Sequence, residues 1–183
     1  MPTAADNLGE FISRPFLKLI PKSVAPNSIT VANLFVNIIQ LMLACVSVKL
    51  GPLEATPPRV LMVVCGILTL TSTILDCLDG MQARRTGTCS LYGRALDHTI
   101  DSLTVPMVAF GLSIAARVPF EMGFTAALVT TLVYTTQLRI ENLTNVDPGA
   151  PGVFGQLAIA GVFVLLSVFP QWVEGIAKWV MLL

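Results

Sequence analysis

The sequence predicts an all-α protein: a polytopic transmembrane bundle of about six helices, preceded by an amphipathic helix in the membrane interface. Apolar residues make up 54% of the 183 residues, charged residues make up 12%, and the mean hydropathy is +0.77. Soluble domains carry about 25% charged residues. The apolar residues also form runs. A run of about 20 residues is long enough for a helix to cross a bilayer.

The N-terminal segment, residues 1–24, is expected to lie along the membrane surface. Apolar residues recur at roughly helical spacing over residues 8–20, and basic residues between them can face anionic head groups. Pro15 is expected to kink this helix or to start a second turn. The segment shows no small-residue cleavage site after an apolar run, so no secretory leader is expected.

Residues 25–183 are expected to form the transmembrane domain. Its first helix should cover residues 29–48, after the helix-start signal Pro26-Asn27-Ser28. Asn33, Asn37 and Gln40 interrupt this span at near-helical spacing and should face other helices rather than lipid. Further spans are expected in or around residues 60–75, 103–116, 122–138 and 153–169, and a short last helix is expected after Pro170.

The charges orient this bundle and exclude some partners. With the N-terminus inside, seven basic residues lie on the cytoplasmic side and three lie outside, which agrees with the positive-inside rule. We therefore expect a multi-pass integral membrane protein, in the inner membrane of a bacterium or in endoplasmic reticulum or Golgi membranes of a eukaryote. Eleven basic and eleven acidic residues cancel, so no nucleic acid is expected as a partner.

Four acidic residues lie close together in the sequence, at the ends of two apolar runs. They are Asp76, Asp79, Asp97 and Asp101. Steps of three and four residues place the first pair on one helix face and the second pair on the face of the next helix. Carboxylates at membrane depth are costly and by default mark function. Two such helices facing each other would bring the four carboxylates together.

A cluster of four carboxylates predicts a metal site. Four like charges cannot share a small site without neutralisation, and all-oxygen ligands favour Mg²⁺, Mn²⁺ or Ca²⁺ over zinc. A pair of such ions suits phosphoryl chemistry, and Arg84 on the same face is a candidate phosphate clamp. The alternative is a structural salt-bridge network of Asp76 and Asp79 with Arg84 and Arg85.

The stretch Asp76-Cys-Leu-Asp79-Gly80-Met-Gln-Ala83-Arg84, followed at fixed spacing by Gly93, Asp97 and Asp101, resembles the signature of the CDP-alcohol phosphotransferases. All eight signature positions are filled. The resemblance implies that an acceptor hydroxyl attacks the phosphorus that bears the alcohol of a CDP-alcohol, and that CMP leaves. It also implies Mg²⁺ or Mn²⁺, as two ions, and a homodimer.

The resemblance assigns roles to single residues. Asp76, Asp79 and Asp97 become metal ligands, and Asp101 becomes a metal ligand or the base that takes the acceptor proton. His98 is an alternative base, because histidine suits proton transfer near neutral pH; it is otherwise a partner of Asp101 or a head-group contact. Gly80, Ala83 and Gly93 are expected to line the cytidine pocket, with Arg84 on phosphate. Further candidate substrate contacts are Arg85, Tyr92, Arg94 and Arg139.

Residues 25–30 and 82–102 are similar to the cholinephosphotransferases and ethanolaminephosphotransferases. The favoured function is therefore transfer of phosphocholine or phosphoethanolamine to diacylglycerol, in phospholipid biosynthesis. Arg94 departs from the acidic residue typical of that branch and suits an anionic acceptor. The alternative is a CDP-diacylglycerol-dependent synthase that uses glycerol 3-phosphate, serine or inositol phosphate. From another class, a divalent-cation carrier is a third hypothesis.

Overall fold

The computed structural model describes residues 4–52, 55–144 and 152–169, and these residues form six α-helices. The helices are α1 (Ala4–Leu17), α2 (Pro26–Lys49), α3 (Thr56–Thr86), α4 (Leu91–Ala115), α5 (Phe120–Thr144) and α6 (Gly152–Val168). The all-α class is confirmed. Within the described ranges, α2, residues 58–86 of α3, and α4 are long and apolar enough to cross a membrane. The total of about six spans stays a prediction, and the helix expected after Pro170 falls outside the described residues.

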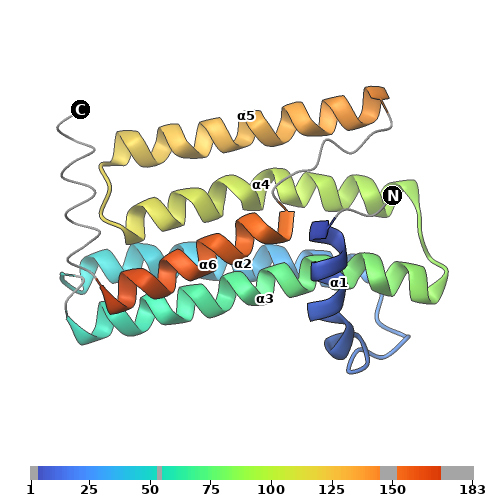
Figure 1. Ribbon diagram of the computed structural model, residues 1–183, viewed down its shortest axis with the longest axis horizontal. Coiled ribbons are helices and arrows are strands. Elements are labelled where there is room, and N and C mark those ends of the chain that lie inside the picture. The colour runs from blue at the N-terminus through green and yellow to red at the C-terminus, as the bar shows by residue number, and fades with distance from the viewer. Residues whose placement is uncertain (1–3, 53–54, 145–151, 170–183) are drawn as a thin grey trace.

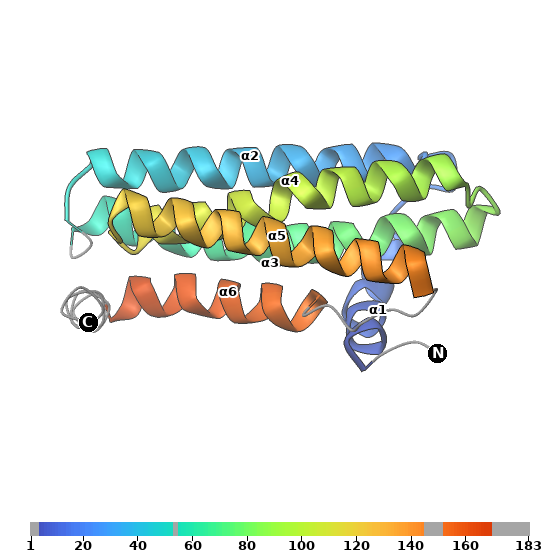
Figure 2. The same ribbon diagram turned by 90° about the horizontal axis from the view of Figure 1, so that it is seen from above.

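Helices α2 to α5 run lengthwise beside one another, α6 lies along α3, and α1 crosses one end of α3 (Figure 1, Figure 2). Helix α2 packs against both α3 and α4, whereas α5 packs on α4 and α6 packs on α3. Helices α3 and α4 make few direct contacts with each other. Helix α2 therefore packs on both of them and links them. Helix α2 begins and α3 terminates at the same end of the bundle. We call this the acidic end.

A short connection brings the end of α3 beside the start of α4. Gly87 ends α3 with φ +69°, a left-handed conformation that glycine adopts at little cost. The backbone N–H groups of Gly87 and Thr88 both donate to the carbonyl of Ala83. Ser90 then caps α4, because its Oγ accepts a hydrogen bond from the Gly93 N–H at 3.0 Å. The acidic stretches of both helices consequently lie at the acidic end.

One face of α2 is polar and buried against the neighbouring helices. The Asn37 side chain donates to Ser72 Oγ at 2.9 Å, and Ser72 Oγ donates to Asn33 Oδ1 at 2.7 Å. Asn33, Asn37 and Gln40 are each at most 2% exposed. The prediction that these three face other helices is confirmed. In a membrane, apolar side chains gain little by leaving lipid for another helix. Hydrogen bonds between helices therefore contribute to their association.

The opposite end of the bundle is closed by an apolar core. Side chains from α2, α3, α4 and α6 meet there with no exposed surface: Ala44, Met62, Cys65, Ala115 and Phe163. All four cysteines are free thiols. The bundle thus changes along its length from an apolar end to the acidic end.

The end of α3 also holds the chain that leads from α1 to α2. Arg85 donates to the carbonyls of Leu17 and Ile20, at 2.6 and 2.7 Å. Gln82 donates to the carbonyls of Pro21 and Val24. These four bonds place α1 beside the acidic end. Pro15 lies in the last turn of α1, and the location of α1 in a membrane interface stays a prediction.

We expect Asn37→Ala to lower the free energy of unfolding by about 1 kcal/mol, because it removes the hydrogen bond to Ser72 and interhelical hydrogen bonds in membranes are of that size. Reversible unfolding in mixed detergent micelles measures the change. The control is Ile39→Ala on the same helix, where the side chain is 48% exposed. Equal losses for the two variants would contradict the structural role of the polar face.

Candidate active site

A pocket of about 290 Å³ opens at the acidic end, between the start of α2, the end of α3 and the start of α4. Its walls come from all three helices and from the connection between α3 and α4. The lining residues are Pro26, Asn27, Thr30, Asp79, Gly80, Ala83, Arg84, Thr88, Cys89, Ser90, Gly93, Arg94 and Asp97. Every predicted nucleotide-binding residue is therefore on the pocket wall.

The four predicted metal ligands come together beside this pocket. Asp76 lies within hydrogen-bonding reach of Asp101 and also interacts electrostatically with Asp97 and Asp79. Asp79 and Asp97 line the pocket, whereas Asp76 and Asp101 are not among its lining residues. Two donors from other helices reach this cluster: Thr30 Oγ1 donates to Asp79 Oδ2 at 2.6 Å, and the Tyr134 hydroxyl donates to Asp101 Oδ2 at 3.1 Å.

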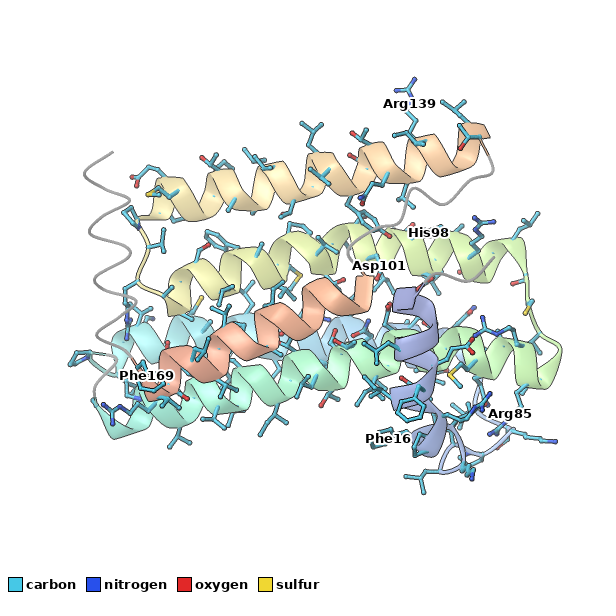
Figure 3. The ribbon with its side chains drawn as sticks, in the orientation of Figure 1. Phe16, Arg85, His98, Asp101, Arg139 and Phe169 are labelled. Atoms are coloured by element: carbon cyan, nitrogen blue, oxygen red, sulfur yellow. The ribbon has the colours of Figure 1, made fainter. Side chains whose placement is uncertain are left out.

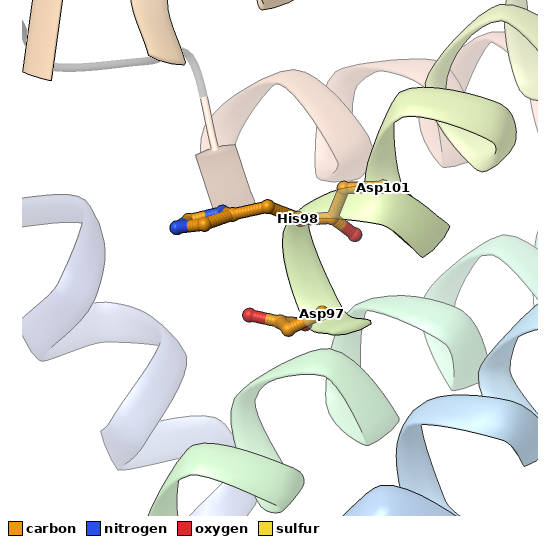
Figure 4. Close-up of side chains that lie close together, drawn as sticks. All are labelled: Asp97, His98 and Asp101. Atoms are coloured by element: carbon orange, nitrogen blue, oxygen red, sulfur yellow. The ribbon is translucent and has the colours of Figure 1, made fainter. Parts of the chain in front are cut away.

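The donor atoms fit a hard cation. One oxygen each from Asp97 and Asp101 and one ring nitrogen of His98 lie within 4.8 Å of one another, on neighbouring turns of α4 (Figure 4). Asp97 Oδ1 is buried and has no hydrogen-bond partner in the described part of the chain. A buried carboxylate oxygen without a partner is costly, and a divalent cation bound by oxygen would satisfy it. The observed group includes His98, which the sequence suggested only as a base or a contact.

The two signature glycines act differently. A Cβ added to Gly80 would meet only Arg84 Nη1, at 3.5 Å, so this position borders open pocket space. A Cβ added to Gly93 would lie 3.2 Å from Ser90 Oγ and 3.3 Å from Asn27 Oδ1. Gly93 therefore allows a close approach between the starts of α4 and α2, whereas Gly80 leaves room for a ligand.

Two arginines stand at the rim of the pocket. Arg84 forms an ion pair with Glu10 of α1, at 2.6 Å, and both side chains are partly exposed. Arg94 Nε donates to His98 Nε2 at 3.3 Å. The capped N-terminus of α4 adds a partial positive charge at the same place. The pocket wall thus combines two arginines with the carboxylates of Asp79 and Asp97, which suits a phosphate group bridged to a cation.

Three of the four other candidate substrate contacts lie away from this pocket. Arg85 is bonded to carbonyls of the chain between α1 and α2 (Figure 3). Tyr92 is 71% exposed and is not on the pocket wall. Arg139 points away from the bundle on the outer side of α5 (Figure 3). Only Arg94 lines the pocket.

Sequence reasoning missed several polar residues at the site, among them Asn27, Thr30, Ser90 and Tyr134. Pro26-Asn27-Ser28 indicates a helix start in the sequence, but a polar side chain such as Asn27 so near a membrane span also suits a site. Tyr134 is a polar group within the apolar run of α5, a signal of the same kind. Its partner on α4 cannot be identified from spacing.

Comparisons with known proteins show the family of this chain. A protein-family model for CDP-alcohol phosphatidyltransferase matches residues 23–183. Cholinephosphotransferase 1 of Homo sapiens is 41% identical over 101 residues, which are 55% of this chain and 24% of the human protein. A CDP-diacylglycerol–serine O-phosphatidyltransferase of Encephalitozoon cuniculi is 34% identical over 97 residues, or 53% of this chain and 24% of that protein.

An archaetidylinositol phosphate synthase of Pyrococcus horikoshii is 33% identical over 79 residues, which are 43% of this chain and 42% of that protein. The matched part of this chain thus spans about a quarter of the length of the human and Encephalitozoon relatives, and less than half of the archaeal one.

We expect Gly80→Leu to weaken CDP binding by about 10- to 100-fold, because the new side chain would extend into the pocket and overpacking typically costs 1–3 kcal/mol. Binding of CDP to the detergent-solubilised protein measures the effect. The matched control is Gly161→Leu on α6, where an added Cβ meets nothing within 4 Å. CDP affinity equal to that of the wild type in Gly80→Leu would rule out this pocket as the nucleotide site.

Proposed function

Since the chain belongs to the CDP-alcohol phosphatidyltransferase family, we propose that it transfers a substituted phosphate group from a CDP-alcohol to an acceptor hydroxyl and releases CMP. One observation carries this proposal: four carboxylates from two helices meet at a pocket whose rim holds two arginines. In the reaction, a bond forms between the acceptor oxygen and the phosphorus that bears the alcohol. The bond from that phosphorus to the oxygen of CMP breaks.

We propose that Asp76, Asp79 and Asp97 hold two divalent cations, Mg²⁺ or Mn²⁺, and that Asp101 beside them is either a further metal ligand or the general base. The orphaned Asp97 Oδ1 and the mutual approach of the four carboxylates support this assignment. When bound, the ions would supply stabilisation of the negative charge on the attacking and leaving oxygens. Thr30 orients Asp79 through the 2.6 Å hydrogen bond to Oδ2, which leaves the other carboxylate oxygen for a metal.

The wall formed by Gly80, Ala83 and Gly93 is proposed to receive cytidine, with the phosphates toward the arginines. Open space at Gly80 supports a flat ligand there. Arg84 is paired with Glu10 in the structure, and its guanidinium can hold a phosphate in two parallel hydrogen bonds. Arg94, on the same rim, can attract a second anionic group.

Asp101 is the proposed general base, and His98 is the alternative. His98 Nε2 accepts a hydrogen bond from the Arg94 guanidinium. That nitrogen cannot take a proton without losing this bond. Asp101 instead lies among the acids of the cluster with a fixed orientation. The acceptor proton is therefore assigned to Asp101.

The favoured substrates are CDP-choline or CDP-ethanolamine with diacylglycerol. Support comes from the similarity to human cholinephosphotransferase 1. The relatives named for serine and for archaetidylinositol phosphate support the alternative, in which CDP-diacylglycerol reacts with a polar alcohol, and Arg94 at the rim suits a phosphorylated acceptor. A divalent-cation carrier is less favoured, because the four acids gather at one end of the bundle rather than along a pathway.

The orientation and the assembly of the protein are part of the same proposal. The excess of basic residues on one side supports a pocket that faces the cytoplasm. In this orientation a water-soluble CDP-alcohol would reach the pocket directly from the cytoplasm. A lipid acceptor would reach it from the bilayer. A homodimer is proposed from the family resemblance alone.

CMP release from the purified protein tests the function. We expect CMP from CDP-choline or CDP-ethanolamine with diacylglycerol, and we expect release to require Mg²⁺ or Mn²⁺. Release from CDP-diacylglycerol with a polar alcohol only would establish the alternative branch. Uptake of Mn²⁺ into vesicles without any release of CMP would identify a carrier and refute the enzyme assignment.

Two substitutions separate the metal roles from the base role. Asp79→Asn should weaken metal affinity, so that excess Mg²⁺ or Mn²⁺ restores part of the rate. Asp101→Asn should lower kcat by about 10²- to 10⁴-fold, the usual contribution of a general base, without metal rescue. His98→Ala is the comparison. If His98→Ala carries the large loss in kcat and Asp101→Asn is rescued by metal, the base is His98.

A further inference from the structure

Tyr134 is the residue through which α5 reaches the acidic site. Its hydroxyl donates to Asp101 Oδ2 at 3.1 Å, and it also interacts electrostatically with Asp97 and Asp76. Helix α5 packs against α4, but large apolar side chains such as Leu128 and Leu132 on it are exposed. The phenol is half-buried at the site and has a polar partner there, so a packing role does not account for it.

The hydrogen bond makes the two oxygens of Asp101 unequal. A phenol donates one proton, and here that proton is directed to Oδ2. A carboxylate that turns about its Cβ–Cγ bond exchanges its oxygens, and a hydrogen bond to one of them opposes this rotation. Asp76 also lies within hydrogen-bonding reach of Asp101, and the hydrogen bond from Tyr134 adds a contact from a different helix that fixes the position of Oδ2.

We propose that Tyr134 is a positioning residue for Asp101: it holds Oδ2 and thereby presents Oδ1 to the acceptor hydroxyl. This inference rests on the proposed function, in which Asp101 takes the acceptor proton. In that step the oxygen–phosphorus bond to the acceptor forms, the bond to CMP breaks, and the proton passes from the acceptor hydroxyl to Asp101. Tyr134 exchanges no proton and acts through the orientation of the carboxylate.

The test begins with Tyr134→Phe, which removes the donor and keeps the ring. We expect kcat for CMP release to fall about 10- to 100-fold, the range for loss of a hydrogen bond to a charged group, while KM for the CDP-alcohol stays unchanged. The control is Thr136→Val, which removes a hydroxyl from an exposed position about 200° around the same helix. Thr136→Val should retain the wild-type kcat.

A double substitution separates positioning from a structural role. If Tyr134 acts through Asp101, Tyr134→Phe should cause little further loss in an Asp101→Asn background, because residues that act as a unit are not additive. An equal fold-loss in both backgrounds would overturn the proposal. So would an unchanged kcat in Tyr134→Phe, or a KM raised for CDP-choline with kcat intact, which would make Tyr134 a head-group contact.

The same assays distinguish this inference from the function on which it rests. A wild-type protein that releases no CMP from any CDP-alcohol refutes the proposed function, and the positioning role is refuted with it. A wild-type protein that is active, with a Tyr134→Phe variant of equal activity, refutes the positioning role alone.

Discussion

The repulsion among four carboxylates is the constraint on which the rest of the structure depends. Two acids from α3 and two from α4 interact with one another, and such a group is stable only with cations or hydrogen-bond donors around it. Helices α3 and α4 make few direct contacts, and α2 packs on both of them. The acids of the two helices therefore approach each other through their side chains. Donors from α2 and α5, Thr30 and Tyr134, reach the cluster from outside.

This arrangement needs a fixed register between α2 and α3. The hydrogen bonds among Asn33, Asn37 and Ser72 provide it in the middle of the two helices, and the apolar core around Phe163 closes the far end. A slip of one helical turn, about 5.4 Å, would separate Thr30 from Asp79. In lipid, where helices gain little from hydrophobic burial against each other, such specific contacts decide which register forms.

The segment before α2 is tied to the same site. Gln82 and Arg85 of α3 donate hydrogen bonds to backbone carbonyls of the segment that joins α1 to α2. Glu10 of α1 forms an ion pair with Arg84, which lines the pocket. The arginine expected to contact phosphate thus already has an anionic partner. A phosphate that binds there would replace one negative charge with another.

The sequence by itself determined what depends on local periodicity. Steps of three and four residues placed the acids on common faces, and polar interruptions predicted the buried face of α2. Tertiary structure decided which faces meet. The partners Thr30 and Asp79 are 49 positions apart, Asp101 and Tyr134 are 33 apart, and Glu10 and Arg84 are 74 apart. Arg84 and Arg85 are neighbours with different partners, because about 100° of helix rotation separates them. Periodicity fixes the face on which a residue lies, but packing selects the helix opposite it.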